Sequence, residues 1–126
     1  MKIALETLNK IVVRLQQKEP VTDIEKDMLL GLLKSVLSYY KQKEDISMLD
    51  VIIVLYERLT GVKSDKSIER KRFIEHYSAK GLVSLLDELE QKGKRQKENN
   101  VDNFYIQDTR DFYKIVANKI KERGII

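Results

Sequence analysis

The chain contains no cysteine, and its 126 residues include one histidine, one proline and five glycines. Without cysteine it has no disulfide framework, no thiol nucleophile and no thiolate metal site. A single histidine leaves no two-histidine metal spacing and few ways to activate a nucleophile. No glycine-rich cofactor loop or EF-hand pattern is present either. We therefore expect a protein that is not an enzyme and that takes no cofactor and no metal.

Long hydrophobic runs are also missing. The longest apolar run, residues 51–56, is far below the roughly 18 residues needed to span a bilayer. The first twenty residues carry charges throughout, and they lack the unbroken apolar core of a signal peptide. These features predict a cytoplasmic protein with no membrane partner.

The net charge of +4 is small, and it is unevenly distributed along the chain. Residues 1–60 hold nine basic and nine acidic side chains, whereas residues 61–126 hold fifteen basic and eleven acidic ones. Dedicated DNA-binding domains usually have a stronger basic bias than this. The asymmetry nevertheless keeps nucleic acid as a possible, less favoured partner.

The scarcity of proline and glycine, with charged and aliphatic residues mixed throughout, favours helix over sheet. An apolar stripe of helical spacing predicts a first helix over 2–18, which Pro20 ends. The residues Thr22–Glu25, "TDIE", form a capping-box pattern for the next helix, which extends to about Gln42. Gly61 suits the position just beyond the end of a third helix. We predict an all-α fold, a single compact bundle of five or six amphipathic helices with short connections, forming one domain over 1–126.

Two short segments remain ambiguous between helix and strand. Residues 51–54, "VIIV", are β-branched, but Leu55, Tyr56 and Leu59 continue the pattern and favour a buried helix. Residues 104–106 are equally compatible with a short extended segment. Asp108 is a plausible cap for a last helix, in which Phe112, Val116 and Ile120 belong to the apolar stripe.

Residues 68–81, "IERKRFIEHYSAKG", gather the only histidine with several basic and aromatic residues. On a helical wheel Phe73, Ile74 and Tyr77 form a core-facing stripe, and Arg70 lies beside it with its aliphatic stem at the edge. His76 lies at the boundary without a partner, which favours a half-solvated side chain over a catalytic one. A following helix with a leucine stripe over 82–89 ends near Gly93. Its acidic outer face argues against a DNA-reading helix, because it would repel phosphate.

The segment 91–103 is the best candidate for a mobile basic loop. It holds four basic residues in six positions, which we take as possible contacts for an anionic partner: Lys92, Lys94, Arg95 and Lys97. The simpler interpretation of the same residues is a solvated loop or helix extension.

These observations favour a non-catalytic, intracellular helical protein that acts as a protein–protein interaction module and binds a protein partner or a second copy of itself. Tyr39, Tyr40 and Tyr56 are candidate interface aromatics, although they are equally suited to a core. The alternative is a nucleic-acid-associated accessory or regulatory protein that uses the basic residues over 92–97.

Overall fold

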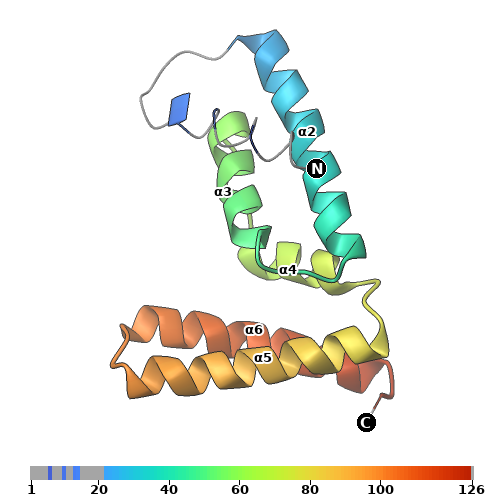
Figure 1. Ribbon diagram of the computed structural model, residues 1–126, viewed down its shortest axis with the longest axis vertical. Helices are drawn as coiled ribbons and strands as arrows, with labels where there is room; N and C mark the ends of the chain where they lie inside the picture. Colours follow the sequence, from blue (N-terminus) through green and yellow to red (C-terminus); the bar gives the residue numbers. More distant parts are fainter. Residues whose placement is uncertain (1–5, 7–9, 11–12, 15–21, 126) are drawn as a thin grey trace. The chain divides into compact units, whose positions relative to one another are not determined.

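The structure is a computed structural model that describes residues 6, 10, 13, 14 and 22–125. The helix predicted over 2–18 lies almost entirely outside the described residues. Over the described part the chain contains five helices and no strand, which confirms the all-α prediction (Figure 1). The chain divides into two compact units, Met1–Asp65 and Lys66–Ile126, and each is described by itself. That the whole chain forms one domain stays a prediction.

Helix α2, Asp23–Gln42, begins at the predicted capping box. The Glu25 backbone N–H donates to Thr22 Oγ1 at 3.2 Å, and the Thr22 backbone N–H donates to Glu25 Oε1 at 3.4 Å. Two N–H groups that the first turn would leave without a partner are thereby satisfied. The side chain of Arg14 forms an ion pair with Glu25, and its hydrogen bond, with those from Thr22, holds the pKa of the Glu25 carboxyl below its usual value.

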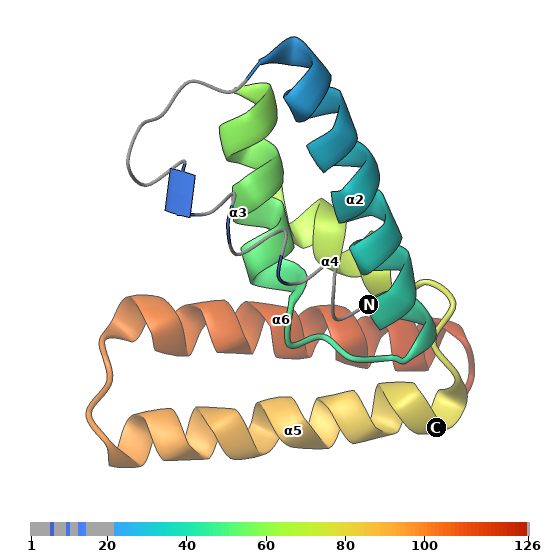
Figure 2. The same ribbon diagram turned by 45° about the horizontal axis from the view of Figure 1, so that its top comes forward.

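Helix α3, Leu49–Thr60, lies beside α2 in both ribbon views (Figures 1 and 2). The buried cluster between them consists of Leu29, Leu33, Val36, Ile52, Leu55 and Leu59. Residues 51–54 are therefore helical, as the periodicity favoured, and their β-branched side chains do not form a strand. Gly61 ends α3 in the left-handed conformation with φ 71°, which glycine adopts without steric strain.

The second unit consists of α4, Lys66–Ile74, α5, Ala79–Glu98, and α6, Asn103–Glu122. Helices α5 and α6 form an antiparallel hairpin along their whole length (Figure 2). Their facing stripes are the predicted ones, and the buried side chains are Leu82, Leu85, Leu89, Phe112, Val116 and Ile120. Helix α4 adds Phe73 and Ile74, and Tyr77 from the following turn is also buried.

Two features of this unit correct the sequence-based predictions about residues 68–81. Helix α4 ends at Ile74, so His76 lies in the turn before α5, where it is exposed. Arg70 does not cover an edge, because it is only 4% exposed. Its guanidinium donates to both carboxylate oxygens of Asp108, at 3.1 and 2.9 Å, and lies 4.4 Å from the centre of the Phe112 ring.

Asp108 therefore does not cap α6. The helix begins one and a half turns earlier, where the Asp102 side chain accepts a hydrogen bond from the Phe104 backbone N–H at 2.9 Å. Residues 104–106 are accordingly helical. The bidentate bond between Arg70 and Asp108 instead connects α4 to the N-terminal half of α6 and gives the buried guanidinium a counter-charge. Among the described residues, Arg70 Nε has no hydrogen-bond partner.

The loop predicted over 91–103 is also wrong for most of its length. Helix α5 does not end near Gly93 but continues through the basic residues to Glu98, and the connection to α6 is residues 99–102. Asn100 makes the turn with φ 52°, a conformation in which asparagine is enriched. Polar composition suggested a loop here, whereas the segment continues α5 and faces Ile106 and Tyr113 of α6 across a groove.

We predict that Asp108→Ala lowers the free energy of unfolding by about 3 kcal/mol, since it leaves the buried Arg70 guanidinium without its counter-charge. Chemical denaturation followed by circular dichroism measures the change. Asp111→Ala, on the exposed side of the same helix, is the matched control and should change stability by less than about 0.5 kcal/mol. Equal effects of the two substitutions would contradict the importance of the Arg70 contact.

Acid should weaken the same contact. Burial raises the pKa of Asp108, but the hydrogen bonds and charge of Arg70, with a contribution from Lys66, outweigh it and hold the pKa below its ordinary 3.8. A carboxyl whose pKa is lower in the folded protein than in the unfolded chain stabilises the folded protein. This stabilisation is fully present above the pKa of the unfolded chain, and it is lost as the pH falls through the pKa of the folded protein. We expect the wild-type unfolding free energy to decline from about pH 5 downwards. In Asp108→Asn the unfolding free energy should decline less steeply with falling pH. The decline that is left comes from other carboxyl groups such as Glu75, because the hydrogen bond from Lys119 lowers the pKa of Glu75.

Candidate functional site

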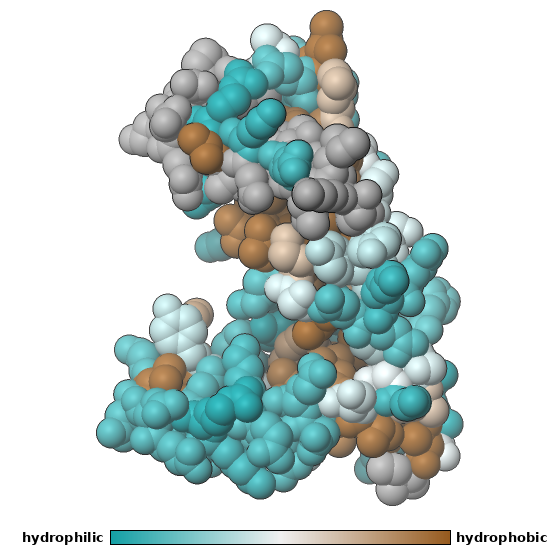
Figure 3. All heavy atoms as spheres, in the orientation of Figure 1, coloured by the Kyte–Doolittle hydropathy of each residue, from teal (hydrophilic) through white to brown (hydrophobic). Residues whose placement is uncertain are grey.

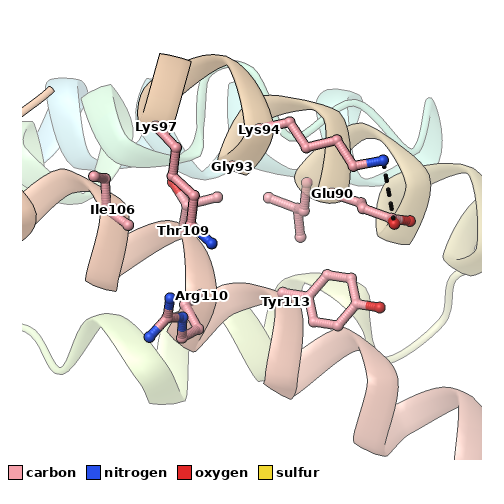
Figure 4. Close-up of a pocket in the computed structure, with 9 residues that line it drawn as sticks. Glu90, Gly93, Lys94, Lys97, Ile106, Thr109, Arg110 and Tyr113 are labelled. Carbon is pink, nitrogen blue, oxygen red and sulfur yellow. Dashed lines mark ion pairs between the residues drawn. The ribbon is translucent and has the colours of Figure 1, made fainter. Parts of the chain in front are cut away.

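A groove of about 260 Å³ lies between the C-terminal half of α5 and the N-terminal half of α6 (Figure 4). Nine residues line it: Leu89, Glu90, Gly93, Lys94, Lys97, Ile106, Thr109, Arg110 and Tyr113. Its size is slightly below the roughly 300–1,000 Å³ of typical small-molecule pockets.

The groove combines an apolar interior with a basic rim. Leu89 from α5, with Ile106 and Tyr113 from α6, contributes the apolar surface. Figure 4 shows Lys94 and Lys97 projecting from α5, and Arg110 from α6. The helical pairing brings together cations that are more than ten positions apart in the sequence.

One rim cation is already partly neutralised. Lys94 Nζ lies 3.7 Å from Glu90 Oε1, and both side chains are more than half exposed, so this pair contributes little to stability. Among the described residues, Lys97 and Arg110 have no ion-pair partner. The groove thus presents a net positive charge, with Glu90 as its one acidic lining residue.

Gly93 is unusual because it lies in the interior of α5, where glycine is about 1 kcal/mol less favourable than alanine. A Cβ atom at this position would have nothing within 4 Å, so close packing does not require glycine. The missing side chain leaves the groove open. Sequence reasoning interpreted this glycine as a helix end, and for that reason it missed Gly93, Ile106 and Thr109 as parts of one site.

The four predicted basic residues separate into two pairs. Lys94 and Lys97 line the groove, whereas Lys92 and Arg95 are exposed and do not line it. A difference of two positions along a helix is a rotation of about 200°, which places the second pair on the other side of α5. The structure therefore does not bring all four to one surface.

The three predicted interface tyrosines belong to the first unit, where two of them are partly buried. Tyr40 and Tyr56 pack against the α2–α3 core cluster. Tyr39 is 37% exposed, and its ring meets Tyr40 edge-on with ring centres 5.4 Å apart. Lys43 Nζ lies 5.5 Å from the Tyr39 ring centre. Their role as an interface stays a prediction.

A more exposed aromatic pair lies in the first turn of α6. Phe104 is 70% exposed and Tyr105 is 58% exposed, with ring centres 5.5 Å apart. The space-filling view shows a mostly hydrophilic surface over the α5–α6 hairpin, with small hydrophobic patches (Figure 3). Exposed aromatic side chains of this kind are typical anchors in protein interfaces.

A second depression, of about 160 Å³, lies between α4 and α6, and its lining includes Lys71, Glu75, Lys119 and Glu122. Its charges largely satisfy one another, because Lys119 Nζ lies 2.8 Å from Glu75 Oε2 and 4.0 Å from Glu122 Oε2. It is therefore a weaker candidate for a charged partner than the α5–α6 groove.

Within the described part of the chain, no group of three or more histidine, aspartate or glutamate side chains is arranged to hold a metal ion. No described helix has both the length and the apolar character needed to cross a bilayer. These two findings concern residues 6, 10, 13, 14 and 22–125.

We predict that Gly93→Ala increases the free energy of unfolding by about 0.5–1 kcal/mol, because alanine favours the helix and its methyl group meets no neighbour. Gly31→Ala is a matched change in the interior of α2, where a Cβ atom also has open space. Thermal or urea unfolding should show a similar gain for both variants. Destabilisation by Gly93→Ala alone would mean that the helix is distorted at the groove.

Comparison with known proteins identifies no relative: no protein-family model matches the chain, and no curated protein or solved structure is significantly similar to it.

Proposed function

We propose that this is a non-catalytic, intracellular protein–protein interaction module, and that the groove between α5 and α6 binds an acidic, amphipathic helix of a protein partner. The observation that supports the proposal is the combination of an apolar interior with Lys94, Lys97 and Arg110 on the rim. A partner helix would insert apolar side chains between the two helices and place its carboxylates beside the rim cations.

Two further features support a protein partner. The exposed Phe104 and Tyr105 rings at the same end of the hairpin offer apolar area beyond the groove. The chain as a whole offers one histidine and no cysteine for catalysis, and His76 is exposed in a turn outside the groove. The lack of cysteine is also compatible with a reducing compartment such as the cytoplasm.

Nucleic acid is the second candidate, because Tyr113 lies among three cations and an aromatic ring can stack on an exposed base. The arrangement of charge favours protein instead. Lys92 and Arg95 lie away from the groove, so the four basic residues over 92–97 do not form one continuous track for phosphates. Glu90 in the groove would repel a phosphate as well.

Fluorescence anisotropy distinguishes the two candidates. A labelled acidic amphipathic helical peptide should bind the wild-type protein with Kd of about 100 μM, as expected of a small transient contact. Lys94→Glu with Lys97→Glu should weaken binding at least tenfold, because the rim becomes negative. The matched pair Lys92→Glu with Arg95→Glu has the same spacing and the same charge change, and it should weaken binding less than twofold.

A labelled single-stranded oligonucleotide serves as the second probe in the same experiment. Binding that is stronger than that of the peptide, falls steeply with salt and is lost in both charge-reversal pairs would replace the protein-binding proposal with the nucleic-acid alternative. Absence of peptide binding to the wild type, or equal losses in both pairs, would contradict the assignment of the groove.

A further inference from the structure

The first two turns of α2 carry apolar side chains that are directed into solvent. Ile24 is 75% exposed and Met28 is 70% exposed, and the two lie four residues apart on one helix face. Asp23 and Asp27 are also exposed and have the same spacing. Residues 23–28 therefore form a short helical surface, the α2 acidic turn, in which an apolar pair lies beside a carboxylate pair.

The core packing of α2 explains why these side chains face outwards. Leu29, Leu33 and Val36 face α3, and at about 100° per residue Ile24 and Met28 lie more than 90° from the centre of that stripe. Packing of α2 against α3 thus leaves the apolar pair uncovered. The capping carboxylate of Glu25 points elsewhere, because it bonds to Thr22 and Arg14.

The α2 acidic turn is complementary to the α5–α6 groove in chemistry and in size. The groove has apolar lining from Leu89, Ile106 and Tyr113, which can receive an isoleucine and a methionine side chain. The rim cations Lys94 and Lys97 are three residues apart on α5, which corresponds to about 4.5 Å along the helix axis. The carboxylates of Asp23 and Asp27 are four residues apart on α2, which corresponds to about 6 Å. Flexible lysine side chains span that difference easily.

We propose that the protein self-associates by inserting the α2 acidic turn of one copy into the α5–α6 groove of another copy. This inference rests on the proposed function, since it identifies a second copy of the chain as the occupant of the same groove. Ile24 and Met28 are buried against the apolar lining, while Asp23 and Asp27 pair with Lys94 and Lys97. The contact area is small, so association is weak and depends on concentration.

Sedimentation velocity and light scattering over about 10 μM to 1 mM, a range matched to a small weak interface, provide the first test. The average mass of the wild type should rise with concentration, and added salt should reduce the rise. Lys94→Glu with Lys97→Glu should remove it, and so should Asp23→Lys with Asp27→Lys. The control pair Lys92→Glu with Arg95→Glu should associate as the wild type does.

The decisive experiment mixes the two double variants that should not self-associate. The Lys94→Glu, Lys97→Glu protein has an acidic groove, and the Asp23→Lys, Asp27→Lys protein has a basic turn to fill it. Each should remain monomeric alone, and an equimolar mixture should recover at least part of the wild-type mass increase. Failure of the mixture to associate, or unchanged association of either double variant alone, would overturn the proposal.

Lysine at position 23, in the first turn of α2, opposes the helix dipole, so circular dichroism must confirm that the Asp23→Lys, Asp27→Lys variant is folded. If it is not, Ile24→Gln with Met28→Gln removes the apolar part of the contact while keeping residues that favour a helix, and it should also abolish association.

The experiments distinguish failure of the self-association proposal from failure of the proposed function. A wild type that stays monomeric to 1 mM but binds the acidic peptide refutes self-association alone, whereas a groove that binds no peptide refutes the proposed function.

Discussion

Burial of two apolar stripes between α5 and α6 is the interaction on which the candidate site depends. Leu82, Leu85 and Leu89 on one helix face Phe112, Val116 and Ile120 on the other, and all six are less than 10% exposed. Each fully buried side chain of this size contributes about 1.5–3 kcal/mol relative to exposure. The pairing determines which basic side chains share a groove with α6.

The stripe loses its large residues toward the joined end of the hairpin. Beyond Leu89 the next inward-facing positions of α5 are Gly93 and Gln96, and the opposite residues of α6 are Thr109 and Ile106. Less apolar volume fills this part of the interface, so a groove remains where the core ends. Lys94 and Lys97 border it because they follow the same helical face as Glu90 and Gly93.

The Arg70–Asp108 contact adds a different constraint to the same unit. A guanidinium that is 4% exposed needs a charged partner, and Asp108 supplies both carboxylate oxygens from α6. Helix α4 is thereby connected to α6. No residue of α4 lines the groove, where Arg110 and Tyr113 lie.

Helical periodicity and capping chemistry were enough to predict the helices from residue 22 onward, together with the capping box at Thr22 and the helix end at Gly61. Local rules succeed there because an apolar stripe and a cap depend on residues within a few positions of one another. The same rules misplaced the ends of the last helices. Gly93 and the polar run after it suggested a loop, and Asp108 suggested a cap, since neither pattern contains information about the facing helix.

Tertiary structure alone decided which residues meet. Arg70 and Asp108 are 38 positions apart, and Lys97 and Arg110 reach one groove from two helices. The sequence determined which side chains carry charge and which face of each helix is apolar. The helical repeat places Lys94 and Lys97 away from Lys92 and Arg95, but only the pairing of α5 with α6 decided which pair lines the groove, because the rotation of a helix about its axis is settled by what it packs against.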